Sequence, residues 1–362
     1  MTNAKVAAVT LMGHKHMQRG VPCEDYSIAV ERNNVSAVVV SDGAGGKQYT
    51  HARYGSKIAC ETVAQLVTDH FDALYNENRE AAVKNLIIAA IHTNMAVAIE
   101  KMKLDNLERL SCTLVFCAIK DRRVLCGHLG DGLIVRVSRG GISPLTMPQN
   151  GEGASSTYFV TANHAADYMR LIKTTTDDIH GIALMTDGVQ DLVYDENSGL
   201  VRPVIAKMVD TLKGSRENCE KEITQILEKY VVGASNVSDD ASFGIVLLEN
   251  TESPATDKLP QKTDDFPRNQ QDTFKNLQQE WLPRVKKAKN VIINAGATQF
   301  VPPKSENAEK INPKEDHQSK ESEDKIEEFE EKRKVGDGFV LGIIVGILLC
   351  AVVMFVLYMV LS

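Results

Sequence analysis

The chain has 362 residues, of which 43% are hydrophobic and 25% charged, and these values exclude a wholly disordered, collagen-like or disulfide-scaffold protein. Its formal net charge of −7 gives no reason to expect a nucleic-acid partner. The seven cysteines are scattered and contain no Cys-x-x-Cys pair, which is typical of reduced thiols in a cytosol-like compartment and argues against a zinc ribbon.

Residues 1–250 are expected to form one domain of mixed α and β structure. Runs of β-branched or alternating residues predict strands at 6–12, 26–30, 36–41, 113–119, 124–129, 133–138, 182–186 and 243–248. Helical patterns run over 54–75, 79–102 and 215–230. Several strands follow one another across short turns such as KDRR and GDG, which predicts antiparallel pairing. The fold class is therefore α+β, with helices packed on β-sheet.

Acidic residues recur where the predicted strands begin or end. They are, in chain order, the pair Glu24 and Asp25, then Asp42, Asp131 and Asp187, and finally the pair Asp239 and Asp240. A single Asp-Gly after a strand is usually a hairpin turn, so turns alone are the alternative interpretation.

The placement of these acids predicts a metal site. A strand end is rigid enough to hold a side chain, and a neighbouring glycine lets backbone come close. Carboxylate and carbonyl oxygens are the ligands that Mg²⁺ and Mn²⁺ prefer. Several acids that meet without a cation would repel one another and raise each other's pKa, whereas a pair of bound metal ions removes that cost.

Over roughly residues 5–248 the order of the motifs resembles the metal-dependent protein serine/threonine phosphatases of the PPM, or type 2C, class. The shared motifs are an acidic pair (24–25), Asp-Gly-x-Gly-Gly (42–46), a Ser-Thr strand (111–113), Gly-Asp-Gly (130–132), Asp-Gly (187–188) and a late Asp-Asp (239–240). The resemblance implies a four-layer α-β-β-α sandwich of two antiparallel sheets flanked by helices, with two Mg²⁺ or Mn²⁺ ions at one edge.

Carried over residue by residue, the resemblance implies that Asp42 bridges both metal ions and that Gly43 offers its carbonyl oxygen. Either Glu24 or Asp25 would help to hold one of the ions, and their adjacency leaves both open.

The resemblance also implies that Asp187 and Asp239 hold the other ion. Some bacterial relatives bind a further ion near the Gly-Asp turn, which nominates Asp131 as a ligand of a third. The implied reaction is hydrolysis of phosphoserine or phosphothreonine by a water activated between two metal ions, without a phosphoenzyme.

Two positions depart from the family pattern. Many animal and plant members have histidine after Asp-Gly, where this chain has Ala44, and an arginine before the acidic pair, where this chain reads HMQRG at 16–20. Either His16 or Arg19 is expected to contact phosphate or donate a proton, and an imidazole suits proton donation because it titrates near neutrality. The alternative is that both are ordinary loop residues.

Residues 251–337 are expected to form a polar, largely disordered linker, because they offer little apolar surface to offset the entropy of ordering. Within it lies one island, FKNLQQEWLPRVKKAKNVIINA, which contains the only tryptophan, Trp281. The island is interpreted either as a docking helix or, preferably, as a transient helix broken at Pro283.

Residues 338–361 are expected to form a single C-terminal transmembrane helix. The stretch 339–361 contains no charged residue, and as a helix at ~1.5 Å per residue it would cross a hydrocarbon core of about 30 Å. The basic run KRK at 332–334 predicts that the large domain lies on the cytoplasmic side. A buried core helix is the alternative. Small residues that would permit a homodimer recur every four positions, at Gly338, Gly342 and Gly346.

These features predict a membrane-tethered phosphatase whose partners are phosphorylated proteins and, through 338–361, membrane lipid. One alternative is a catalytically weak or inactive phosphatase-fold scaffold that binds phosphoproteins, which Ala44 favours. The retained Asp42, Asp187 and Asp239 count against that alternative. A hydrolase of small phosphate esters is a third interpretation of the same site.

Overall fold

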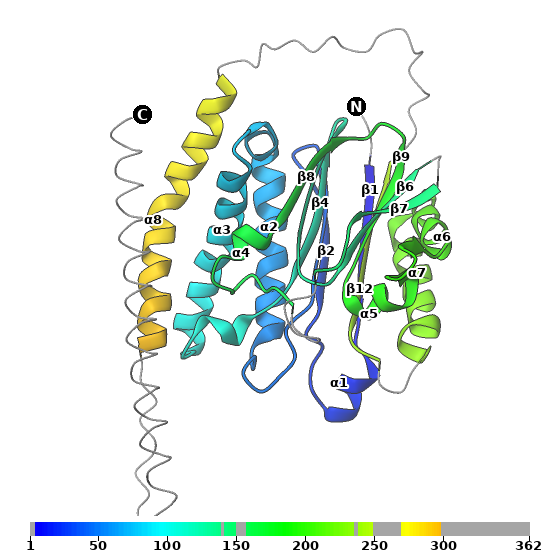
Figure 1. Cartoon of the computed structure of the whole chain (residues 1–362), viewed down its shortest axis with the longest axis horizontal. Helices are drawn as coiled ribbons and strands as arrows, with labels where there is room; N and C mark the ends of the chain where they lie inside the picture. The colour runs from blue at the N-terminus through cyan, green and yellow to red at the C-terminus, as the bar shows by residue number, and fades with distance from the viewer. Residues whose placement is uncertain (1–3, 139–140, 150–156, 235–237, 249–268, 298–362) are drawn as a thin grey trace, which may run out of the picture. The chain divides into compact units, whose positions relative to one another are not determined.

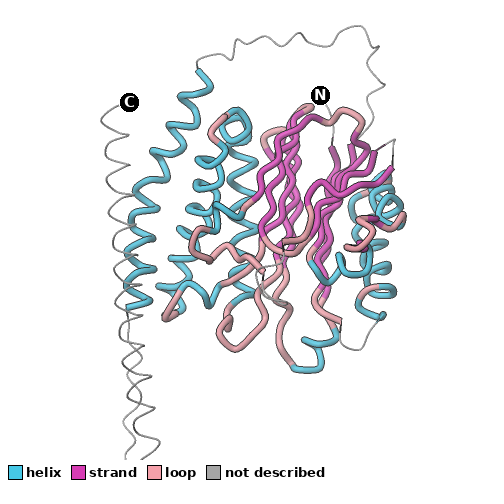
Figure 2. Tube along the Cα trace, viewed as in Figure 1, coloured by secondary structure: helices cyan, strands magenta, loops and turns pink. Residues whose placement is uncertain are grey.

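Two five-stranded antiparallel sheets form the centre of the domain (Figures 1 and 2). The computed structural model describes residues 4–138, 141–149, 157–234, 238–248 and 269–297. The first sheet has the order β1 (Ala4–Leu11), β12 (Ala241–Leu248), β9 (Ile179–Met185), β6 (Leu133–Ser138) and β7 (Gly141–Thr146). The second has the order β2 (Tyr26–Arg32), β3 (Val35–Ser41), β4 (Leu114–Lys120), β5 (Arg123–Leu129) and β8 (Arg170–Thr175).

Central strands such as β3, β4 and β12 are buried on both faces, and β3 shows how its sequence produces this. Side chains alternate between the two faces of a strand. Val38 and Val40 pack between the two sheets, against residues such as Leu184 of β9. Ala37 and Val39 point the other way, into the core under the helices. A strand of this kind therefore reads as an almost continuous apolar run.

Helices cover the outer face of each sheet. The bounds are α1 (His14–Arg19), α2 (Ala52–Asn76), α3 (Glu80–Met102), α4 (Ala165–Tyr168), α5 (Asp187–Val193), α6 (Val204–Asp210), α7 (Arg216–Tyr230) and α8 (Asn269–Ala297). Helices α2, α3 and α8 share a core with the second sheet, and α5, α6 and α7 share one with the first (Figure 1). The predicted α-β-β-α sandwich of antiparallel sheets is thus confirmed. A small hairpin, β10 (Tyr194–Asp195) with β11 (Leu200–Val201), follows α5.

Within the described ranges, α3 is the one helix long and apolar enough to cross a membrane by length and composition. More than half of its most apolar window is buried inside the domain, and side chains such as Ile87 and Ile91 lie in the core. It is a helix of the protein interior. The predicted span at 338–361 lies outside the described residues.

The island within the predicted linker is an ordered helix, α8, which corrects the preferred interpretation of a transient helix broken at Pro283. The helix continues through Pro283. Phe274 and Leu277 are almost fully buried in the core that α8 shares with α2 and α3. This apolar packing stabilises the helix although proline removes one backbone hydrogen bond. The rest of the predicted linker, 251–268 and 298–337, lies outside the described residues.

Candidate active site

The sheet register brings the predicted acidic residues to one end of both sheets. In the second sheet Tyr26 pairs with Ser41, so Asp25 before β2 lies beside Asp42 after β3. In the first sheet Phe243 pairs with Met185, which puts Asp187 after β9 at the same end as the residues that precede β12. The turn from β5 into β6 passes from one sheet to the other at this end and carries Asp131.

Asp25 and Asp42 form the centre of this group. They lie beside each other at the ends of paired strands, close enough for each to shift the pKa of the other. Burial raises the pKa of Asp25 to about 6. Burial and the negative charges of Asp187, Asp25 and Asp131 hold the pKa of Asp42 well above its usual range. Without a cation nearby, two neighbouring buried carboxyl groups therefore disfavour being charged at the same time.

Hydroxyl groups fix this pair from both sheets. Thr186, the last residue before α5, donates a 2.8 Å hydrogen bond to Oδ2 of Asp25. The backbone N–H of Asp42 donates to Oγ1 of Thr113 at 3.0 Å, and the N–H of Thr113 donates to the carbonyl of Asp42 at 2.8 Å. These threonines hold the backbone and carboxylates of the site in place. No sequence motif points to Thr186, because its partner Asp25 is 161 positions away along the chain.

Gly43 allows the chain to pass close to the acidic pair. A Cβ atom at this position would lie 2.5 Å from the carbonyl oxygen of Glu24, far inside any normal contact. Residue 43 forms an isolated antiparallel bridge with Cys112, and the N–H of Ala44 donates to the carbonyl of Ser111 at 3.0 Å. The Asp-Gly-Ala-Gly-Gly motif is thus fixed by backbone contacts on both sides.

Asp187 and Asp131 extend the negative charge across the gap between the sheets. Asp187 begins α5, and its Oδ1 accepts a 2.7 Å hydrogen bond from the N–H of Gly188. Burial and the charges of Asp131, Asp25 and Asp239 hold the pKa of Asp187 well above its usual range. Burial also raises the pKa of Asp131.

A second cluster surrounds Asp240, beside the first. Oδ1 of this buried carboxylate accepts a hydrogen bond from the N–H of Gly13 at 2.8 Å, and Oδ2 accepts one from the N–H of Glu24 at 2.6 Å. Nδ1 of His16 lies 2.6 Å from the same Oδ2, and Nε2 of His16 lies 3.6 Å from Oε2 of Glu24. Asp240 therefore ties the loop over 13–24 to the start of β12.

The other predicted site residues, Asp239, Arg19 and Glu24, lie farther from the centre formed by Asp25 and Asp42. Asp239 is 43% exposed at its side chain and pairs with Nζ of Lys15 at 2.6 Å. Arg19 is exposed at the end of α1. Burial raises the pKa of Glu24 to about 7, and Glu24 faces His16 while its neighbour Asp25 faces Asp42. Of the two adjacent acids, Asp25 is the one in contact with Asp42.

The donor chemistry of the site fits hard divalent cations. Oδ1 of Asp131 and Oδ1 of Asp25 are both buried without a hydrogen-bond partner in the described part of the chain. A cation would satisfy both oxygens and remove the mutual repulsion. Within the described ranges, however, no group of three or more His, Cys, Asp or Glu side chains is arranged to hold one ion. The side chains as placed do not close a coordination shell.

The sequence pattern of the family described as "Protein phosphatase 2C" matches residues 12–228. The chain belongs to the protein phosphatase 2C family. Serine/threonine-protein phosphatase 3 of Escherichia coli (strain K12) is 22% identical over 254 residues, which cover 67% of this chain and 98% of that relative. Family membership confirms the expected class of enzyme, a serine/threonine protein phosphatase.

Solved structures of bacterial phosphatases are also similar to this chain. The catalytic domain of the serine threonine protein phosphatase PstP, in complex with two manganese ions, is 15% identical with a TM-score of 0.49, and the alignment covers 69% of this chain and 100% of that one. Stp1 from Staphylococcus aureus is 17% identical with a TM-score of 0.47, with coverage of 69% and 96%.

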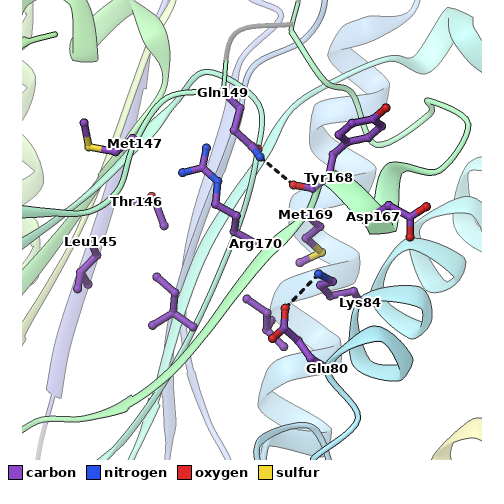
Figure 3. A pocket seen from close by; sticks show the side chains of 12 residues that line it. Glu80, Lys84, Leu145, Thr146, Met147, Gln149, Asp167, Tyr168, Met169 and Arg170 are labelled. Atoms are coloured by element: carbon purple, nitrogen blue, oxygen red, sulfur yellow. Dashed lines mark hydrogen bonds and ion pairs between the residues drawn. The ribbon is translucent and has the colours of Figure 1, made fainter.

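The structure also contains a cavity of about 610 Å³ (Figure 3). It lies between the end of β7 and the start of β8, and Gln149 and Tyr168 line it. Nε2 of Gln149 donates to the carbonyl of Tyr168 at 2.8 Å (Figure 3). The N–H of Gln149 donates to the carbonyl of Gly130 at 2.9 Å. The cavity thus adjoins the turn that carries Asp131, but none of the predicted site residues lines it.

The phosphatase also contains one Cys-x5-Arg spacing, Cys117 to Arg123, and its geometry excludes a cysteine phosphatase loop there. Cys117 is fully buried between the sheets in β4. Arg123 lies in β5, across the hairpin, and pairs with Asp72 at 2.8 Å. The thiol and the guanidinium therefore cannot surround one phosphate.

Proposed function

We propose that this chain hydrolyses phosphoserine and phosphothreonine in proteins with the help of two divalent ions, Mg²⁺ or Mn²⁺. The observation that carries the proposal is the carboxylate cluster of Asp25, Asp42 and Asp187. These groups meet at the common end of the two sheets. Burial raises the pKa of all three, and the charge of Asp25 further raises the pKa of Asp42 and of Asp187. Membership of the protein phosphatase 2C family supports the same site.

The residues that would hold the ions are Asp42, the carbonyl of Gly43, Asp25, Asp187 and Asp239. Bound ions would supply positive charge for the phosphoryl oxygens and lower the pKa of a water molecule. Because the side chains as placed do not converge on one point, ion binding would require the carboxylates to rotate. Asp239 would also have to leave Lys15.

Two further assignments belong to the same proposal. Asp131 is nominated for a third ion, because its buried Oδ1 has no partner among the described residues. Arg19 is nominated for a contact with substrate phosphate, since it is exposed at the end of α1, within the segment 13–24 that Asp240 holds. Glu24, turned toward His16, would support Asp25 from the rim.

The test uses the purified full chain with a phosphothreonine peptide and a small aryl phosphate as substrates. We expect Mn²⁺-dependent phosphate release that EDTA abolishes and that Asp42→Asn lowers by at least about a hundredfold. Asp121→Asn is the matched control, because Asp121 is exposed in the hairpin between β4 and β5. Absent turnover with intact peptide binding would instead support the phosphoprotein-binding scaffold. Turnover of the aryl phosphate alone would favour a hydrolase of small esters.

We also propose that residues 338–361 anchor the phosphatase in a membrane, with the catalytic domain on the cytoplasmic side. Support comes from the uncharged stretch at 339–361 and the basic run at 332–334. The full chain should stay in the membrane pellet after alkaline carbonate extraction, whereas a chain that ends at Asp337 should not. Release of the full chain would refute the anchor. The glycines at 338, 342 and 346 would permit a homodimer, which cross-linking in the membrane can detect.

A further inference from the structure

Helix α8 carries a stripe of exposed residues on the side away from the core. Leu282, Lys286, Lys289 and Ile293 are spaced by four, three and four positions, which places them along one face of a helix. Leu282 is 45% exposed and Ile293 66% exposed, and both lysines are exposed. We call these four residues the outward stripe.

The outward stripe belongs to a net-positive segment of a net-negative chain. Five basic and two acidic residues lie in 269–297, whereas 1–268 holds 28 basic and 34 acidic residues and 298–362 holds eight and twelve. Arg284 is engaged by Glu280 at 3.6 Å and lies over the ring of Trp281. Lys286 and Lys289 form no ion pair with any other residue that the structure describes. Their charge is therefore available to a partner.

We propose that the outward stripe of α8 lies on an anionic membrane surface and holds the catalytic domain against it. Lysines that flank exposed aliphatic side chains suit the lipid interface, where the aliphatic groups enter the headgroup boundary and the ammonium groups pair with lipid phosphate. Each basic residue near such a surface strengthens binding by about fivefold.

The proposal rests on the anchor proposed above, which would bring α8 to the bilayer. Because α8 is part of the domain, only residues 298–337 would separate the folded body from the predicted span. The acidic segment 315–331 of the same chain is the competing occupant. It has nine acidic residues but only two apolar ones, Ile326 and Phe329. It therefore complements the charge of the two lysines but offers little apolar surface to cover Leu282 and Ile293.

Trp281 makes a direct test possible, because it is the only tryptophan of the chain and lies in α8. The full chain is reconstituted into vesicles that contain a lipid with a nitroxide on its headgroup. One set of vesicles is phosphatidylcholine, and the other contains about one third phosphatidylglycerol. We expect strong quenching of Trp281 emission in the anionic vesicles only. The double variant Lys286→Glu with Lys289→Glu should lower it to the level seen in phosphatidylcholine.

The matched control is Lys221→Glu with Lys229→Glu, which makes the same charge change on α7, over the other sheet, and should leave quenching unchanged. Equal phosphate release from a soluble peptide by all variants shows that they are folded. Equal quenching in the wild type and in the Lys286→Glu, Lys289→Glu variant would overturn the proposal. The proposal would also be overturned if Trp281 were not quenched and zero-length cross-links joined Lys286 or Lys289 to residues 315–331. Carbonate extraction reports on the anchor separately, so failure of the anchor and failure of the stripe can be distinguished.

Discussion

The hydroxyl of Thr186 donates a 2.8 Å hydrogen bond to Oδ2 of Asp25 and thereby joins the two sheets at the acidic end of the sandwich. Thr186 follows β9 in the first sheet, and Asp25 precedes β2 in the second. The same hydroxyl accepts a 2.9 Å hydrogen bond from the N–H of Ser242 in β12. One buried threonine thus fixes the distance between strands that carry different acids of the site.

Thr186→Val should weaken the site and the fold together. It leaves Oδ2 of Asp25 and the N–H of Ser242 without this partner in a buried region, which costs about 1–3 kcal/mol of unfolding free energy. Urea denaturation measures the loss, and calorimetric titration with Mn²⁺ should show weaker binding. Thr186→Ser keeps the hydroxyl and is the control. Equal stability of the valine and serine variants would contradict the role assigned to this hydroxyl.

The metal-free protein should become less stable as pH rises from about 4 to about 7. Burial raises the pKa of Asp25 to about 6 and that of Glu24 to about 7, so the folded chain binds more protons than the unfolded chain across this range. Asp25→Asn should flatten the curve and stabilise the metal-free protein at pH 7 by about 1–3 kcal/mol. Thermal unfolding in EDTA measures this difference in stability. Added Mn²⁺ should restore the stability that the wild type loses near pH 7. An asparagine variant that is less stable than wild type at pH 7 would contradict the prediction.

Gly43→Ala should abolish activity and destabilise the domain by at least about 2 kcal/mol, because the added Cβ would lie 2.5 Å from the carbonyl oxygen of Glu24. The same motif offers a matched control in Gly45, where a Cβ would meet nothing within 4 Å. Gly45→Ala should keep both the stability and the Mn²⁺ affinity of the wild type. Phosphate release and urea denaturation of the two variants are compared side by side. Similar behaviour of the two would show that close backbone approach does not define the site.

His16→Gln separates a positioning role from proton donation. Because Asp240 and Glu24 flank the ring of His16, we expect the substitution to loosen the loop over 13–24 and slow the reaction to a similar degree with every substrate. Loss of a proton donor would instead slow a phosphothreonine peptide much more than an aryl phosphate, whose leaving group needs no proton. The ratio of the two rates in variant and wild type decides between these roles.

Helix α8 should contribute to the stability of the catalytic domain. Phe274 is 1% exposed in the core shared with α2 and α3, so Phe274→Ala should cost about 3–5 kcal/mol. Asn276→Ala, at an exposed position of the same helix, should leave the unfolding free energy unchanged within about 0.5 kcal/mol. If both variants unfold at the same urea concentration, α8 is not part of the cooperative domain.

The sheet core and the acidic cluster could be predicted from the sequence, because both depend on patterns within short stretches of the chain. Strands such as β3 are buried on both faces and read as continuous apolar runs. Each acid stands directly beside such a run, so antiparallel pairing alone brings Asp25 next to Asp42 and Asp187 to the same end.

Features that depend on residues far apart in the chain could not be predicted from the sequence. Strand β7 contains Pro144 and β8 is polar, since both lie at sheet edges and need no apolar alternation. The role of Asp240 depends on Gly13, more than 200 positions away. Helix α8 has its apolar side chains at helical spacing, but Pro283 and the polar flanking sequence favoured a broken helix. The apolar surface on α2 and α3 that stabilises α8 exists only in the folded chain.

The number of Mn²⁺ ions bound per chain at equilibrium tests the proposed site most directly. Titration of the metal-free full chain near pH 7 should give at least two bound ions. Protons should be released, because ion binding favours the charged form of carboxyl groups such as Asp42, whose pKa is held well above its usual range. Asp42→Asn should reduce both the stoichiometry and the proton release. Full Mn²⁺ binding by the Asp42→Asn variant, or no binding by the wild type, would contradict the assignment of these carboxylates as the metal site.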